Sequence, residues 1–266
     1  MNAVEAVFAH RKGEIKVEDT MVMRCFDMLR HLPKPEDCWD MNLEQPQWIL
    51  DAHNTCQGRI FMFGTGPSLV SQSHLLPLME HEATWTVNRM AQWDLPFTPL
   101  FHGVAEPAPI IGWGGQVNPT YDYPKVKNRI AVNWWKVTAP GWRWVAKAPD
   151  DVQVRWHGVF GLGDTLPPIP TAWASPLTLT QVALWLGFTQ IYILGCDTTQ
   201  QGQAWDVDKG RTTEPRNIRS IVECADRMKF EIWKAGREIW DCTPGGRLNE
   251  EGALPYKSLE EVLDAG

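Results

Sequence analysis

Short apolar runs that end in glycine are the clearest pattern along this chain. Ile60–Phe63 has the length expected of a fully buried strand and stops at the turn Gly64–Ser68, whose sequence is GTGPS. Ile191–Leu194 has the same character and stops at Gly195–Asp197. The pattern predicts two parallel strands that are neighbours or near-neighbours in one sheet, with both glycine turns at the same end.

Around these runs the chain alternates between helical and strand-like periodicity. The predicted helices are 17–32, 45–53, 71–80, 175–187, 215–235 and 258–263, and the other predicted strands are 83–87, 97–101, 129–132, 152–156 and 238–241. This order predicts a Rossmann-like α/β fold, a mainly parallel sheet flanked by helices. We expect residues 1–58 to form an N-terminal helical extension that caps the α/β domain of residues 59–266.

The turn Gly64–Ser68 has the features of an anion site. A strand that breaks into glycines before a helix leaves backbone N–H groups pointing outward, which suits a phosphate. Gly66 allows close approach of a ligand, so Gly66→Val is expected to abolish ligand binding and leave the protein folded. Pro67 suits the first helical turn, and an ordinary Gly-Pro turn explains the same residues equally well.

Composition narrows the classes of protein that fit. The chain has 266 residues, 44% hydrophobic and 21% charged, as in a globular protein. Its formal net charge of −7 argues against an extended nucleic-acid footprint. We expect no membrane span, and the six cysteines lack metal-ligand spacing, so reduced thiols in a cytoplasmic protein are the simplest interpretation. The sequence is also compatible with a homo-oligomer.

Three blocks of the chain, in this order, resemble the bacterial sialyltransferase family that uses CMP-sialic acid. They are Gly64–Leu69, Thr86–Arg89, and Ala174–Pro176 continued by 183–188 and 191–197. The related archaeal hydroxymethylpterin diphosphokinases share the first block and the strand-Gly-x-Asp block. The resemblance covers roughly residues 59–206, with a weaker echo at residues 239–244.

The resemblance implies a glycosyltransferase that binds a nucleotide-activated sugar, such as a CMP-sugar, and transfers the sugar to a hydroxyl acceptor. One alternative is a pterin-type diphosphokinase that uses ATP and Mg²⁺. Another is a non-catalytic binding protein that retains the fold. No tightly bound cofactor and no metal site are expected, except for Mg²⁺ under the diphosphokinase alternative.

The implied nucleotide-binding residues all follow a strand or begin a helix. They are Gly64, Thr65, Gly66, Pro67, Ser68, Asn88, Arg89, Ser175, Gly195, Asp197, Thr198 and Thr199. Asn88 would hydrogen-bond the nucleotide, because its amide both donates and accepts. Purely local roles fit as well: Asn88 in a turn, Ser175 as a helix cap and Asp197 in an Asx turn.

The catalytic base is where the chain departs from the family it resembles. That family carries a histidine base in a mobile lid, and this chain has no histidine after His157. His102, predicted at the end of the strand 97–101, is the best-placed candidate, and Glu106, Asp197 and Asp206 are the carboxylate options. The lid is expected at residues 200–214, where Arg211 would neutralise the charge of the departing phosphate.

Overall fold

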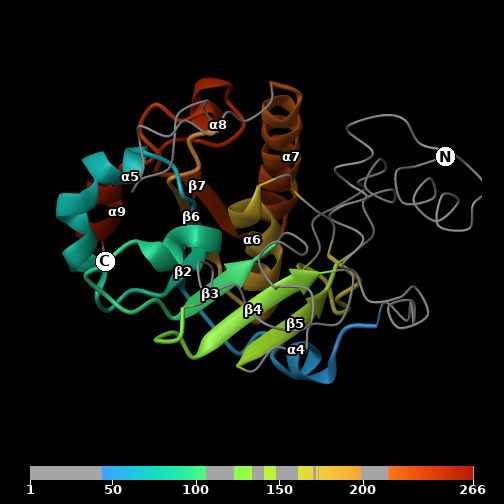
Figure 1. Cartoon of the computed structure of the whole chain (residues 1–266). Coiled ribbons are helices and arrows are strands. Elements are labelled where there is room, and N and C mark those ends of the chain that lie inside the picture. The colour runs from blue at the N-terminus through green and yellow to red at the C-terminus, as the bar shows by residue number, and fades with distance from the viewer. Residues whose placement is uncertain are drawn as a thin grey trace, which may run out of the picture.

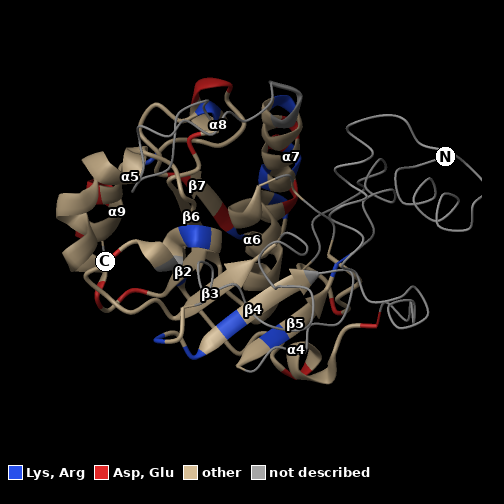
Figure 2. Cartoon of the chain, in the orientation of Figure 1, with Lys and Arg blue, Asp and Glu red and all other residues tan. Residues whose placement is uncertain are grey.

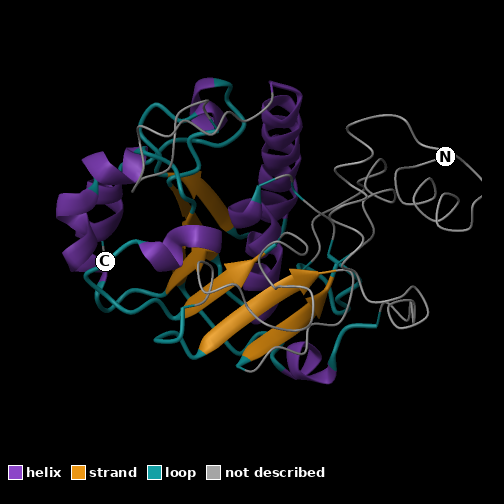
Figure 3. Cartoon of the chain, in the orientation of Figure 1, coloured by secondary structure: helices purple, strands orange, loops and turns teal. Residues whose placement is uncertain are grey.

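The computed structural model describes residues 44–105, 123–133, 141–147, 161–169, 172, 174–198 and 215–265. The predicted helix 17–32, the predicted strand 152–156 and the predicted lid 200–214 lie outside these residues. Within them the chain forms one parallel α/β sheet with helices on both faces (Figures 1 and 3).

The sheet has seven strands in the described residues, and every pairing between neighbours is parallel. The strands are β1 (Arg59–Phe63), β2 (Thr84–Val87), β3 (Phe101–Val104), β4 (Asn128–Asn133), β5 (Trp142–Ala146), β6 (Gln190–Leu194) and β7 (Glu238–Asp241). Their order is β5-β4-β3-β2-β1-β6-β7. The predicted Rossmann-like fold is therefore confirmed.

The strands β1 and β6 are direct neighbours, as the sequence predicted. Their register pairs Ile60 with Ile191 and Phe63 with Leu194. The chain extends from β1 through β2 to β5 on one side and then returns to β6 on the other (Figure 1). Such a reversal of strand order opens a crevice at the carboxyl end of a parallel sheet, where ligands bind in α/β proteins.

Side chains that alternate along β1 enter two different hydrophobic cores. Ile60 and Met62 pack in the core that contains residues of α6 (Ser175–Leu186) and α7 (Pro215–Lys234). Phe61 and Phe63 pack in the core on the opposite face. The elements of that second face are α5 (Ser68–Ser71), η1 (Ser73–Met79), η2 (Asn88–Gln92) and α9 (Leu259–Asp264).

Several predicted boundaries are confirmed by local features. Gly187 ends α6 in the left-handed region, with φ 110°, which glycine adopts without a Cβ penalty. Ser258 and Glu261 form the predicted capping box at the start of α9. α7 is amphipathic and carries basic and acidic residues together, including the ion pair Arg219–Glu223 at 2.8 Å (Figure 2). No helix in the described part of the chain is long and apolar enough to cross a bilayer.

Two regions differ from the prediction. The strand expected at 97–101 begins at Phe101 instead, because Pro96 and Pro99 supply no N–H to a sheet ladder. The helix expected at 71–80 is a short α-helix followed by a 3₁₀ segment that contains Pro77. The strand β5 was not predicted. It begins inside the aromatic block 134–144 and extends past the end of that block.

The first described helix, α4 (Gln47–Asp51), starts after Pro46, as predicted, and lies beside the last strand of the sheet (Figure 1). Just before it, the Gln45 side chain accepts a hydrogen bond from the Ala146 N–H (2.9 Å) and donates to the Ala146 carbonyl (3.1 Å). Trp185 of α6 donates to the Ile49 carbonyl at 2.6 Å. α4 is thereby attached to both the sheet and a helix. The short helix α8 (Arg247–Glu250) follows β7.

Candidate functional site

The two glycine turns at the carboxyl ends of β1 and β6 pack directly against each other. Gly64 donates its N–H to the Leu194 carbonyl at 2.7 Å, and Gly66 donates to the Gly195 carbonyl at 2.8 Å. A Cβ on Gly64 would collide with the Gly195 carbonyl, and one on Gly66 would collide with the Asp197 carboxylate. Both glycines are therefore required by contacts within the protein.

Asp197 links the second turn to the first. Its two carboxylate oxygens accept the N–H of Ser68 at 3.0 Å and the Ser68 hydroxyl at 2.8 Å. Burial raises the pKa of Asp197, and the hydrogen bonds from Ser68 act in the opposite direction. Asp197 thus ties the start of α5 to the end of β6, which is a longer-range role than the Asx turn considered from sequence.

The amides expected to face a phosphate are used inside the protein. Gly64, Gly66 and Ser68 donate their N–H groups to Leu194, Gly195 and Asp197 respectively. The expectation of outward-pointing donors is therefore wrong for these three residues. The reasoning behind Gly66→Val is wrong as well, because its Cβ would meet Asp197 rather than open ligand space.

Asn88 follows β2 and begins η2 in a strained backbone conformation. Its φ of 49° lies in the left-handed region, which asparagine tolerates better than most residues. The Asn88 Nδ2 donates to the Ser175 Oγ at 2.9 Å. The Asn88 Oδ1 is buried and accepts no hydrogen bond from the part of the chain that the structure describes. A buried acceptor without a donor is costly, so this oxygen is the strongest indication of an external partner at this end of the sheet.

Ser175 does not cap α6 as expected from sequence. It is the first residue of the helix, Ala174 occupies the N-cap position, and no side chain caps the helix there. The Ser175 hydroxyl accepts from Asn88 instead, so the start of α6 is attached to the end of β2.

The remaining described members of the predicted nucleotide site lie at the same end of the sheet. Gly195 and Thr198 have φ values of 62° and 50°, so the turn after β6 is left-handed at two positions. Thr65 and Pro67 are half-buried within the first glycine turn. Arg89 is half-buried in η2, directly after Asn88.

His102 does not lie at a strand end. It is the second residue of β3, its side chain is 0% exposed, and its Nδ1 lies 3.0 Å from the Thr86 Oγ1. Its ring meets those of Tyr123 and Trp142 edge-on, each at 5.8 Å between ring centroids. The predicted placement is wrong, because β3 begins four residues later than expected. An imidazole closed off in this way has no access to an acceptor in the crevice.

A third segment joins the site, and no resemblance assigned it a role. Asp241 and Thr243, which follow one another closely at the end of β7, are both fully buried. The Thr243 N–H donates to the Asp241 Oδ1 at 2.9 Å, and the Cys196 N–H donates to the Thr243 Oγ1 at 3.3 Å. The sequence signal for this segment was the pair of polar residues Asp241 and Thr243 at the end of the last predicted strand.

Asp241 has an unusual environment for a carboxyl group. Burial, with a smaller contribution from the nearby negative charge of Asp197, raises its pKa to about 6, and hydrogen bonding by Thr243 opposes the rise. The backbone of Asn249 also lowers this pKa, although the Oδ2 is buried and accepts no hydrogen bond of ordinary geometry within the described residues. Near the carboxyl end of the sheet, Asn88, Asp241 and Gln72 thus each have a buried oxygen that is unsatisfied within the described residues.

Three predicted site residues, Thr199, Asp206 and Arg211, lie outside the described residues. Within the described ranges no three His, Cys, Asp or Glu side chains are grouped closely enough to hold a metal ion. The four cysteines described, Cys56, Cys196, Cys224 and Cys242, are free thiols.

Comparison with known proteins found no matching family model, no similar curated protein and no similar solved structure. The resemblance to sialyltransferases therefore rests on the motifs in the sequence, and the function it implies stays a prediction.

Proposed function

We propose that this protein is a glycosyltransferase-like enzyme that binds a nucleotide-activated sugar at the carboxyl ends of β1, β2 and β6. The observation that carries the proposal is the buried, unpartnered Oδ1 of Asn88, next to the point where strand order reverses. A ribose hydroxyl or a base amino group is a donor of the kind that this oxygen lacks. The Asn88 Nδ2 already donates to Ser175, which holds the amide plane in one orientation.

The reaction is a displacement at the anomeric carbon of the donor sugar. An acceptor hydroxyl oxygen forms the new bond to that carbon, and the bond from the carbon to the nucleotide phosphate oxygen breaks. The nucleotide leaves with the bonding electrons, and a base takes the hydroxyl proton. Arg89 and Arg211 are the candidates that neutralise the leaving phosphate.

The base is assigned to a carboxylate rather than to a histidine. His102 is enclosed within β3, and both oxygens of Asp197 are engaged by Ser68. The remaining carboxylate candidates are Glu106 and Asp206, which both lie outside the described residues, and Asp206→Asn tests the one in the predicted lid directly. Donor binding that persists while transfer is lost would support this role.

Binding of CMP to Asn88 variants tests the proposal. Asn88→Gly accepts the left-handed backbone but removes the amide, whereas Asn88→Asp keeps an acceptor oxygen. We expect the glycine variant to bind CMP about tenfold more weakly by calorimetry, the loss of roughly one hydrogen bond. Asn54→Gly is the matched control, because Asn54 is an exposed asparagine with φ 54° in the turn after α4.

The same measurement separates the alternative functions. CMP, UDP, GDP and ATP are compared with and without Mg²⁺. Binding of ATP that requires Mg²⁺ would favour the diphosphokinase, and nucleotide binding without sugar transfer would favour a non-catalytic protein. No binding of any nucleotide would contradict the proposal.

A further inference from the structure

The turn that follows β6 is held from the side by the segment that follows β7. The Cys196 N–H donates to the Thr243 Oγ1 at 3.3 Å, and the Thr243 N–H donates to the Asp241 Oδ1 at 2.9 Å. The Arg247 N–H donates to the Asp197 carbonyl at 3.3 Å. Two successive residues of the turn are thus bonded to this one segment.

We propose that Thr243 is a positioning residue for the carboxyl end of the sheet. It fixes Cys196, and through Cys196 it fixes the backbone that carries the Asp197 carboxylate. That carboxylate holds the start of α5 through both polar hydrogens of Ser68, so a displaced turn would move the glycine turn as well. The effect on ligand affinity rests on the nucleotide site proposed above, whereas the effect on the turn does not.

The burial of Thr243 suits this role. The side chain is 0% exposed, so no solvent molecule competes for its hydroxyl from outside the fold. A hydrogen bond in such a setting has few alternatives, because the donor N–H of Cys196 is buried with it. Loss of the hydroxyl would leave that amide without a partner, at a cost that a surface threonine would not impose.

Asp241 orients Thr243 at a cost to stability. One of its oxygens accepts the Thr243 N–H, and the other is buried and unpartnered. A buried carboxyl group with an unsatisfied oxygen destabilises a fold compared with an apolar residue of similar size. Asp241 therefore contributes geometry, namely the bond that fixes the backbone at Thr243.

A second contact connects the same segment to the part of the chain that follows the other glycine turn. The Gln72 Nε2, between α5 and η1, donates to the Cys242 carbonyl at 2.8 Å, and the Gln72 side chain is buried. The segment after β7 therefore contacts both the region that follows β1 and the turn that follows β6. Thr243, which bonds Cys196, is the residue next to Cys242, which accepts the bond from Gln72.

Substitutions that differ only in the hydroxyl test this role. Thr243→Val and Thr243→Ala remove the acceptor, and Thr243→Ser keeps it with a smaller side chain. We expect the Cys196 amide to exchange with solvent about tenfold faster in the valine and alanine variants under native conditions, measured by NMR. The serine variant should keep the wild-type rate, and the amide of Ile60, within β1, should be unaffected in all three.

CMP affinity is measured on the same proteins. We expect about fivefold weaker binding in the valine and alanine variants and recovery in the serine variant. If wild-type protein does not bind CMP but exchange at Cys196 accelerates as described, the positioning role stands and the proposed function fails. Unchanged exchange at Cys196 in both hydroxyl-free variants would overturn the positioning role. Equal acceleration in the serine variant, or failure of both hydroxyl-free variants to fold, would also overturn it.

Discussion

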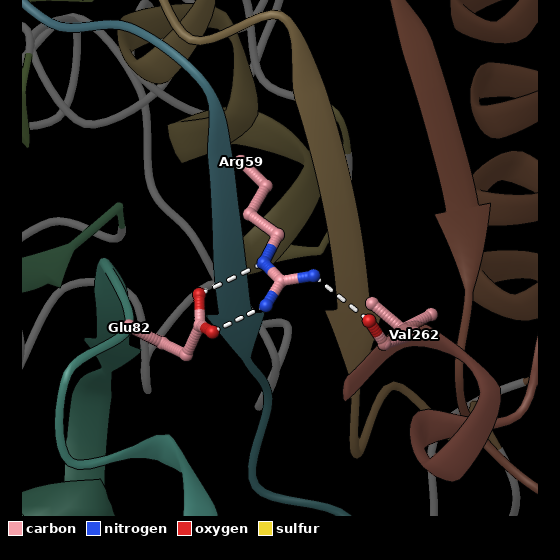
Figure 4. A network of polar contacts seen from close by, with 3 residues as sticks. All are labelled: Arg59, Glu82 and Val262. Atoms are coloured by element: carbon pink, nitrogen blue, oxygen red, sulfur yellow. Dashed lines mark hydrogen bonds and ion pairs between the residues drawn. The ribbon is translucent and has the colours of Figure 1, made fainter. Parts of the chain in front are cut away.

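At the amino end of the sheet Arg59 of β1 is fully paired, whereas at the carboxyl end Asn88 and Asp241 each keep a buried oxygen without a partner. The Arg59 guanidinium forms two hydrogen bonds to the Glu82 carboxylate and one to the Val262 carbonyl at 2.8 Å (Figure 4). Those three groups join β1, the connection before β2, and α9. This part of the amino end is thus closed by a satisfied polar network, whereas the Oγ1 of Thr84, at the start of β2, is buried and has no hydrogen-bond partner among the described residues.

The carboxyl end also carries backbone strain. Asn88, Gly195 and Thr198 adopt positive φ values at the carboxyl end, and two of these residues carry a Cβ that disfavours this conformation. Strain and unsatisfied polar atoms are both unfavourable for stability, and they occur together next to the reversal of strand order. Arg59 is thus satisfied within the fold, whereas Asn88 combines a strained backbone with a buried oxygen that a ligand would satisfy under the proposed function.

The largest expected effect is from Gly64→Ala. The added Cβ would overlap the Gly195 carbonyl, which is backbone and cannot rotate away, so the two turns would have to separate. We expect a loss of about 3 kcal/mol in the free energy of unfolding, measured by urea denaturation. Gly163→Ala is the control, because nothing lies within 4 Å of the added methyl group. Similar stability of the two variants would show that turn packing is not the reason for glycine at position 64.

The next effect is a pH dependence of stability that arises from Asp241. Its pKa is raised from 3.8 to about 6 in the folded protein, so folding disfavours the charged form. The contribution of Asp241 to the free energy of unfolding is most favourable below pH 3.8. It decreases as the pH rises towards 6 and stays at its lowest value above pH 6. A rise of this size corresponds to on the order of 3 kcal/mol, of which about 2 kcal/mol develops between pH 4.5 and pH 7.5.

Asp241→Asn removes this titration. The difference in unfolding free energy between variant and wild type should shift in favour of the variant between pH 4.5 and pH 7.5. Urea denaturation at several pH values measures it, and Asp264→Asn, at an exposed helix end, serves as the control. A difference that is constant with pH would remove Asp241 as the source and weaken the contrast between the two ends.

The smallest expected effect is at the amino end. Arg59→Met keeps the aliphatic part of the side chain and removes the bonds to Glu82 and Val262. The paired side chains are only 21% and 20% exposed, so we expect a loss of about 1.5 kcal/mol in unfolding free energy, with CMP affinity unchanged. A double-mutant cycle with Glu82→Gln isolates the pair. A large effect on CMP binding would show that the two ends are coupled.

Local patterns predicted the elements that carry their own boundary signals. The strands β1 and β6 follow from apolar runs, and α6 and α9 follow from Gly187 and the Ser258 capping box. The nearness of the two glycine turns followed from their place after two buried strands. Because β1 and β6 are neighbours in the sheet, their two glycine turns lie in one region.

The features that were missed depend on contacts between distant residues. The bond from Cys196 to Thr243 spans 47 positions, and no periodicity encodes it. β5 was hidden because tryptophans are compatible with a loop as well as with a strand. The position of His102 was wrong by a few residues, and in a strand such a shift decides between an open end and an enclosed interior.

The Gln45 side chain affects how readily copies of this protein can associate through the edge of the sheet. β5 is the last strand in the order of the described sheet, and a terminal strand offers free backbone groups to which another chain can add. Gln45 bonds both the N–H and the carbonyl of Ala146, as a paired strand would, and the Ile169 N–H also donates to that carbonyl. At this position the backbone is already occupied, which opposes strand addition and therefore aggregation from this side of the sheet.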